Sequence, residues 1–181
     1  MSNDALSTFI EETRANFGPL TTEMVASVHA RLERLVKAPS TERWLQTLHE
    51  EALPSRELYR DTTHGFVLLA HSEPTDLYRA PHDHGRGWVI YALQRGEMQI
   101  GTYARVRDAD DRVRLVKRDL SLLRAGEARI YLPGDIHDTR CVAGPSLLFR
   151  FTDRDLKKED LEAHRVTRYI ERDGVWTVGP A

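Results

Sequence analysis

The sequence has little cysteine and no long apolar run, which argues against a disulfide-stabilised protein and against a membrane-spanning one. Cys141 is the only cysteine among 181 residues, so no disulfide can form within the chain. No apolar stretch reaches the roughly 20 residues that a membrane-spanning helix needs. The first residues, MSNDALSTFIEETRANF, lack the basic and apolar parts of a secretory signal. We therefore expect a cytoplasmic protein without a membrane segment.

Neither sign of charge dominates. The 26 lysine and arginine residues nearly balance the 28 aspartate and glutamate residues, which leaves a net charge of -2. This balance argues against nucleic acid or an anionic membrane as the main partner. The Gly85-Arg86-Gly87 stretch lacks the following helix that a dinucleotide site needs. We expect a small-molecule partner, and a homodimer stays open.

The first 53 residues carry apolar side chains at helical spacing. Breaks at Gly18-Pro19 and Pro39 divide this region into two or three short helices. Thr21 or Thr22, and later Ser40 or Thr41, are suitable residues for the N-terminal caps of these helices. We expect the helices to pack against whatever follows.

Residues 54–152 have the texture of a β domain, with short segments rich in Val, Ile, Leu, Tyr and Phe between turn residues. The turn RDADDR (107–112) predicts a hairpin, and Asp173-Gly174 predicts a last hairpin within a C-terminal extension over 153–181. The strand candidates are FVLLAH (66–71), WVIYAL (88–93), MQIGTYARV (98–106), RVRLVK (112–117), ARIYL (128–132) and SLLFRF (146–151). The sequence thus predicts one mainly β structural domain with an N-terminal helical segment.

His82 and His84 stand one residue apart, just before an apolar run. If residues 82–92 are extended, alternation places both imidazoles on one face, where they can bind one ion. Alone, such a pair beside proline and glycine more often marks a surface turn. The stretch GEARIYLPGDIHDTRC (126–141) supplies a third imidazole, His137, at the entrance of a predicted strand.

At these residues the sequence resembles the cupin superfamily, whose members are double-stranded β-helix barrels, or jelly rolls. The first motif is similar to G(x)5HxH(x)4E(x)6G, with His82, His84 and the closing Gly96 matched. The second is similar to G(x)5PxG(x)2H(x)3N: Gly126, Gly134 and His137 match, Pro133 is displaced by one residue, and Cys141 replaces the asparagine. The resemblance implies a cupin barrel with a metal ion on His82, His84 and His137.

The glutamate of the first motif is replaced by Val89, which cannot bind a metal. A site of three imidazoles is similar to that of the thiol dioxygenase branch, the cysteine and mercaptopropionate dioxygenases. That likeness implies Fe(II), dioxygen and a small thiol-bearing acid or amine that becomes a sulfinate. It also implies that Arg56, which precedes the histidines at that family's spacing, binds the substrate carboxylate. Three imidazoles also accept Zn, Ni or Mn.

The sequence departs from that branch on a late strand. The polar Ser-x-His-x-Tyr set of the branch aligns with Leu148, Arg150 and Thr152. If Leu147, Phe149 and Phe151 pack outward, Arg150 points into the barrel and can bind an anion; the opposite parity turns it outward. Arg86 has the parity of the two histidines and is a second candidate.

Other polar and aromatic residues are expected to pack in the core or to support the site indirectly. We expect Tyr91, Trp88 and Phe66 to pack in the barrel, and Asp83 and Asp138 to turn outward or orient neighbouring backbone. Tyr59 and Tyr103 could offer a hydroxyl to oxygen, although nothing in the sequence selects them, and His71 could act only behind the metal ligands. Two other functions stay open: a metal-bearing sensor or ligand-binding module without turnover, and a zinc or nickel enzyme with a non-thiol substrate.

Overall fold

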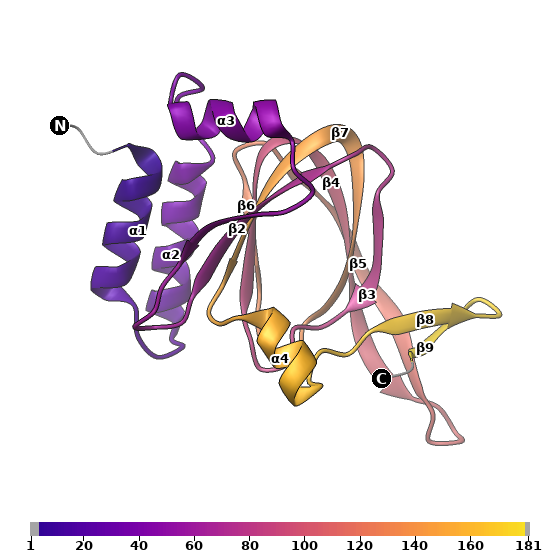
Figure 1. The fold of residues 1–181 in the computed structure, drawn as a ribbon. Helices are drawn as coiled ribbons and strands as arrows, with labels where there is room; N and C mark the ends of the chain where they lie inside the picture. The colour runs from indigo at the N-terminus through magenta and orange to yellow at the C-terminus, as the bar shows by residue number, and fades with distance from the viewer. Residues whose placement is uncertain (1–3, 180–181) are drawn as a thin grey trace.

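The computed structural model describes residues 4–179 and has the predicted fold class, a mainly β jelly-roll barrel with an N-terminal helical segment (Figure 1). The helices are α1 (Ala5–Asn16), α2 (Thr22–Leu35), α3 (Arg43–Glu51) and α4 (Leu156–Ala163). The barrel strands are β1 (Arg56–Arg60), β2 (Val67–Glu73), β3 (Tyr78–His82), β4 (Val89–Arg107), β5 (Val113–Arg124), β6 (Ala128–Tyr131) and β7 (Ile136–Thr152). A separate hairpin joins β8 (Tyr169–Arg172) to β9 (Val175–Val178).

The helices begin and end close to the predicted breaks. Thr21 caps α2, because its hydroxyl accepts the Met24 N–H at 3.2 Å, as predicted. The expected cap of α3 at Ser40 or Thr41 is wrong. Glu42 holds that position without capping α3, and its carboxylate instead accepts the Ala5 N–H at the start of α1. This contact joins the first and third helices.

Alternation along β4 and β7 separates two layers of the core. Trp88 and Ile90 pack with the helices, whereas Val89 and Leu93 lie inside the barrel. In β7, the three residues Leu147, Phe149 and Phe151 belong to the helix-facing core. Both faces of these strands are therefore buried, which explains their nearly continuous apolar runs. Figure 1 shows α1 and α2 side by side on this outer face.

The sheet order is β1-β2-β7-β4-β5, with β3 paired to β7 and β6 paired to β4. The two segments predicted as separate strands, 88–93 and 98–106, form one 19-residue strand, β4. The β4/β7 ladder changes register around Gly96, where φ is +89° and an added Cβ would lie 2.5 Å from the Ala143 carbonyl oxygen. Glycine there lets the paired strands continue past the irregularity.

The C-terminal residues contain the predicted last hairpin. Asp173 and Gly174 both have positive φ, of 51° and 76°, which suits a tight turn between β8 and β9. Figure 1 shows α4 and this hairpin at the same end of the barrel. Among residues 4–179, no helix combines the length and apolarity that a membrane crossing requires.

Candidate metal centre

Three imidazoles from distant parts of the chain converge inside the barrel. His82 ends β3 and is paired in register with His137 of β7, and His84 follows in the loop before β4. Nε2 of His84 lies 3.3 Å from Nε2 of His137. One ligand atom from each histidine lies within 4.8 Å of the others. The structure thus brings together the three histidines of the two sequence motifs.

The condition for strand alternation, that residues 82–92 are extended, does not hold over residues 83–88. Residues 83–88 form a loop, and β4 begins at Val89. Gly85 has a φ of +61°, and a Cβ there would lie 2.8 Å from the Arg165 carbonyl oxygen. The imidazoles of His82 and His84 therefore converge through a tight loop and not through strand alternation.

Asp83 and Asp138 hold the backbone around the histidines, as one of the two expectations for them predicted. The buried Asp83 carboxylate accepts the N–H groups of Gly85 and Thr167, both at 3.0 Å. Asp138 accepts the Gly101 N–H at 2.7 Å. These bonds fix the loop that carries His84 and the strand that carries His137.

The electrostatics keep the imidazoles neutral at pH 7. Burial lowers the pKa of His84 to about 2, and it also lowers the pKa of His82 and, well below its usual range, that of His137. Nδ1 of His82 lies 2.9 Å from the Ala80 carbonyl oxygen, which can only accept, so this nitrogen carries the proton. Nε2 of His82 is then unprotonated and carries the lone pair that metal ligation requires.

The donor set fits a metal ion. Nitrogens bound to one ion at about 2.1 Å lie about 3.0–3.5 Å apart, and the spacing of His84 and His137 falls in this range. Val89, at the position of the missing glutamate, is buried in the barrel core and offers no ligand. Three neutral imidazoles leave the charge of a divalent ion uncompensated and coordination positions open.

Tyr91 lies beside the histidines, a position that the sequence reasoning missed. Its hydroxyl lies 3.4 Å from Nε2 of His84 and 3.3 Å from Nε2 of His137. Burial raises the pKa of Tyr91, so the phenol keeps its proton and can donate it in a hydrogen bond. Strand alternation could have identified Tyr91, because it follows Val89 by two residues and therefore shares its strand face.

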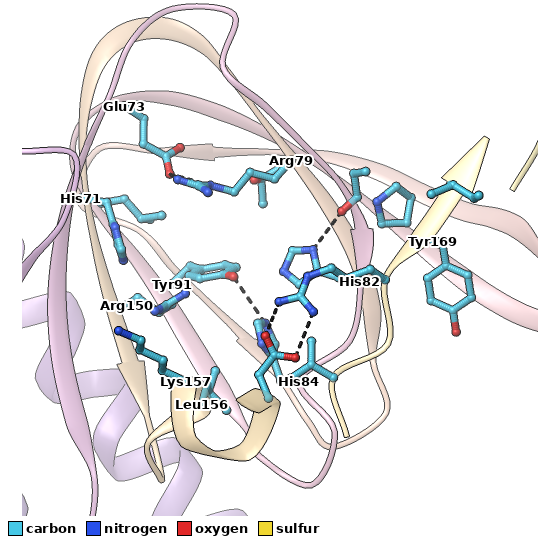
Figure 2. A pocket seen from close by; sticks show the side chains of 18 residues that line it. His71, Glu73, Arg79, His82, His84, Tyr91, Arg150, Leu156, Lys157 and Tyr169 are labelled. Atoms are coloured by element: carbon cyan, nitrogen blue, oxygen red, sulfur yellow. Dashed lines mark hydrogen bonds and ion pairs between the residues drawn. The ribbon is translucent and has the colours of Figure 1, made fainter. Parts of the chain in front are cut away.

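His82 and His84 line a cavity of about 660 Å³. Figure 2 shows the 18 lining side chains, which come from the barrel and from the C-terminal segment around α4 and β8. Leu156, Lys157 and Tyr169 line it from that segment. The volume is in the range of small-molecule sites.

Arg150 faces this cavity, which decides between the two orientations that the sequence left open. Phe149 and Phe151 pack against the helices, with Phe149 5.9 Å from the Trp44 ring and Phe151 6.3 Å from the Phe9 ring. The opposite parity turns Arg150 inward. Thr152 has the same parity, but its hydroxyl donates to the Arg154 carbonyl oxygen at 2.7 Å.

The cavity carries excess positive charge. Arg79 pairs with Glu73 at 3.0 Å, and Arg168 donates to the Asp160 carboxylate at 2.9 Å. Among residues 4–179, no carboxylate forms an ion pair with the other two lining cations, which are Arg150 and Lys157. An anionic ligand therefore suits this cavity.

Several candidates are not among the residues that line the cavity. Arg56 pairs with Glu51 of α3 and is not among the cavity-lining residues, so the structure does not bring it to the metal centre. Arg86 is exposed and lies 3.4 Å from Glu159. The hydroxyls of Tyr59 and Tyr103 donate to Asp61 and Asp138 respectively.

Comparisons with known proteins find matches among solved structures only. No protein-family model matches the chain, and no curated protein matches it. Among solved structures, BH2720 from Bacillus halodurans is 11% identical with a TM-score of 0.48, over 63% of this chain and 80% of that one. The Cnp3 cupin domain of Schizosaccharomyces pombe is 8% identical with a TM-score of 0.43, over 59% of this chain and 63% of that one.

KdgF from Halomonas sp. is 15% identical with a TM-score of 0.42, over 54% of this chain and 74% of that one. Likenesses this weak carry no argument about ligand or activity. The chemistry of the site has to be argued from its own residues.

Proposed function

We propose that this protein is a mononuclear non-haem iron dioxygenase, which oxidises a small thiol-bearing carboxylate or amine with O2 to a sulfinate. The observation that carries the proposal is the set His82, His84 and His137 without a carboxylate, at a cavity that His82, His84 and Arg150 line. An uncompensated divalent charge next to an arginine favours a substrate with a thiolate and a second anionic group.

The reaction balances without a further reductant. A thiol and one O2 give a sulfinic acid, so both oxygen atoms are transferred to sulfur, and sulfur supplies the four electrons that reduce them. When bound by the three histidines, Fe(II) would supply the redox chemistry with dioxygen that protein side chains lack. Every other contribution comes from residues around the cavity.

Arg150 binds and orients the substrate. Its guanidinium can donate two parallel hydrogen bonds to a carboxylate, which fixes both position and rotation. Arg150 is opposite Tyr91 in the β4/β7 register, and Tyr91 contacts His84 and His137. A carboxylate on Arg150 is thus held next to the metal end of the cavity.

Tyr91 and the apolar lining complete the site. The Tyr91 hydroxyl keeps its proton because its pKa is raised by burial, so it stabilises negative charge that develops beside the histidines. Leu148 and Leu156 line the same cavity and exclude water from the reacting groups.

A second function is favoured by the loss of polar partners at Leu148 and Thr152. Leu148 is apolar, and the Thr152 hydroxyl donates to backbone away from the histidines. A metal-bearing sensor or ligand-binding module needs no such partners, and neither does a zinc or nickel enzyme with a non-thiol substrate. Metal content of the protein as isolated separates a zinc or nickel enzyme from an iron enzyme, and turnover separates the enzyme from the sensor.

The test is oxygen uptake by anaerobically iron-loaded protein with cysteine, mercaptopropionate, cysteamine and related thiols. The proposal predicts uptake that requires iron, forms one sulfinate per O2 and disappears in His84→Ala. No uptake from a fully loaded site with any thiol would overturn it and leave the ligand-binding module as the better account.

A further inference from the structure

One wall of the cavity carries three polar side chains in a row. His71 and Glu73 are two residues apart on β2 and share its inner face. In the β2/β7 register, His71 is opposite Leu148 and Glu73 is opposite Ser146, while Arg150 is opposite Leu69. Along the wall the order is therefore Arg150, His71, Glu73, and each position is about 7 Å from the next along the strand direction.

His71 lines the cavity and has one ring nitrogen whose lone pair is unused among residues 4–179. Its Nδ1 lies 3.1 Å from the Pro54 carbonyl oxygen, which can only accept, so Nδ1 carries the proton. Nε2 is then an acceptor, and it is buried without a hydrogen-bond partner among residues 4–179. Burial lowers the pKa of His71 to about 4, which keeps the ring neutral, and only 8% of the residue is exposed.

Glu73 presents a second acceptor. The residue is 2% exposed, and its Oε1 accepts two N–H groups of Arg79 at 3.0 and 3.1 Å. Its Oε2 is buried with no donor among residues 4–179. A buried polar atom without a hydrogen-bond partner destabilises the folded protein, and more so when the group is charged. Two such acceptors on one strand face call for a donor-rich ligand group.

The second acceptor, Glu73, lies away from the metal end (Figure 2). Tyr91 contacts His84 and His137 and is paired with Arg150 across the β4/β7 ladder. Arg150 is in turn opposite a β2 residue four positions before Glu73. Four strand residues correspond to about 13 Å along β2. Figure 2 shows Glu73 across the cavity from His84. A three-carbon acid spans roughly 5 Å and does not reach from one end to the other.

We propose that His71 Nε2 and Glu73 Oε2 form a subsite for a primary ammonium group at the far end of an elongated ligand. The ligand's carboxylate lies on Arg150, an assignment that rests on the proposed function. An ammonium offers three N–H donors to separate acceptors and a charge that complements Glu73. The substrate is thus a thiol-bearing acid with an amine several bonds from its carboxylate.

The test uses probes that lack a thiol, so that it does not depend on oxidation. Binding of ω-amino carboxylates, from 3-aminopropanoate to 7-aminoheptanoate, is measured by anaerobic calorimetry on the iron-loaded protein. Each probe is compared with its methyl isostere, for example 5-aminopentanoate with hexanoate. We expect affinity to rise with length to an optimum, at which the amine binds about 10- to 100-fold more tightly than the isostere.

Glu73→Gln should lower the affinity for the best amine about 10- to 100-fold and leave that for its isostere unchanged. If this variant does not fold, the wild-type ratio of amine to isostere decides the question. Equal affinity for amine and isostere would overturn the proposal, as would the absence of amine binding below about 10 mM. Equal binding of 5-hydroxypentanoate would also overturn it, because a neutral donor would then suffice. Since no probe is oxidised, these results are separate from the oxygen-uptake test.

Discussion

The Tyr91 hydroxyl lies 3.3 Å from Nε2 of His137. This hydroxyl reaches the space between the imidazoles from the strand face where related motifs carry a glutamate. A neutral phenol therefore stands near the position of a charged ligand, and it can donate a hydrogen bond where a carboxylate could only accept one.

Replacing Tyr91 with phenylalanine removes that donor and little else. We expect kcat for thiol oxidation to fall about 10- to 100-fold, because a hydrogen bond to developing charge is lost. Metal content should be unchanged, since the three imidazoles of His82, His84 and His137 provide the ligands. Tyr131→Phe is the matched control: this ring packs against the His137 ring, with centroids 4.0 Å apart, and phenylalanine keeps that contact. Equal losses in both variants would contradict a specific role for the Tyr91 hydroxyl.

Replacing Arg150 tests the carboxylate anchor. Arg150→Ala should raise the KM for a thiol carboxylate about 10- to 100-fold and barely change that for a thiol amine without a carboxylate, such as cysteamine. Arg150→Lys should recover part of the loss, because charge remains but the planar pair of donors does not. Arg56→Ala serves as the control, because Arg56 pairs with Glu51 outside the cavity. A larger effect from Arg56 than from Arg150 would reverse our assignment.

His71 should make stability depend on pH. Its pKa in the folded protein is about 4, below the ordinary 6.5, so between these values only the unfolded chain binds the proton. As pH falls from 6.5 towards 4, His71 therefore lowers the free energy of unfolding by about 1.4 kcal/mol per pH unit.

The control for this effect is His71→Asn, which cannot titrate. Urea unfolding of the metal-free proteins at several pH values should show the wild type losing stability faster than the variant below pH 6.5. A difference between the two proteins that stays constant with pH would show that His71 is not held neutral by the fold.

Asp83 should control how firmly the loop holds His84. Asp83→Asn weakens bonds to the Gly85 and Thr167 N–H groups and removes the ion pair with Arg105, which is 3.1 Å long. We expect metal affinity to fall about 10- to 100-fold, as is usual when a group behind the ligands is changed. The exposed Asp119→Asn is the control, measured by competition with a chelator. Equal affinity in the two variants would mean that the loop needs no such support.

Local patterns predicted the β domain, and the resemblance of two short motifs to the cupins predicted the barrel and the three histidines. Glycines such as Gly96 stand where positive φ is required, and the apolar runs of β4 and β7 mark strands buried on both faces. The two histidine motifs fix their ligands by spacing within short segments. Such features need no knowledge of distant contacts.

Other site residues depend on contacts that spacing does not encode. Arg56 has the expected distance from the histidines in sequence, yet it meets Glu51 and lies outside the cavity. The acceptors of His71 and Glu73 exist because Pro54 and Arg79 occupy only one polar atom of each. No pattern along β2 reveals that.

The central claim is that His82, His84 and His137 bind one metal ion, and the most direct test is a calorimetric metal titration. With Zn(II) as a redox-stable probe, we predict one ion per chain for the wild type and for His64→Ala, whose exposed imidazole lies elsewhere. His84→Ala should lose tight binding while keeping the fold by circular dichroism. A His84→Ala protein that still binds one ion with wild-type affinity would contradict the account.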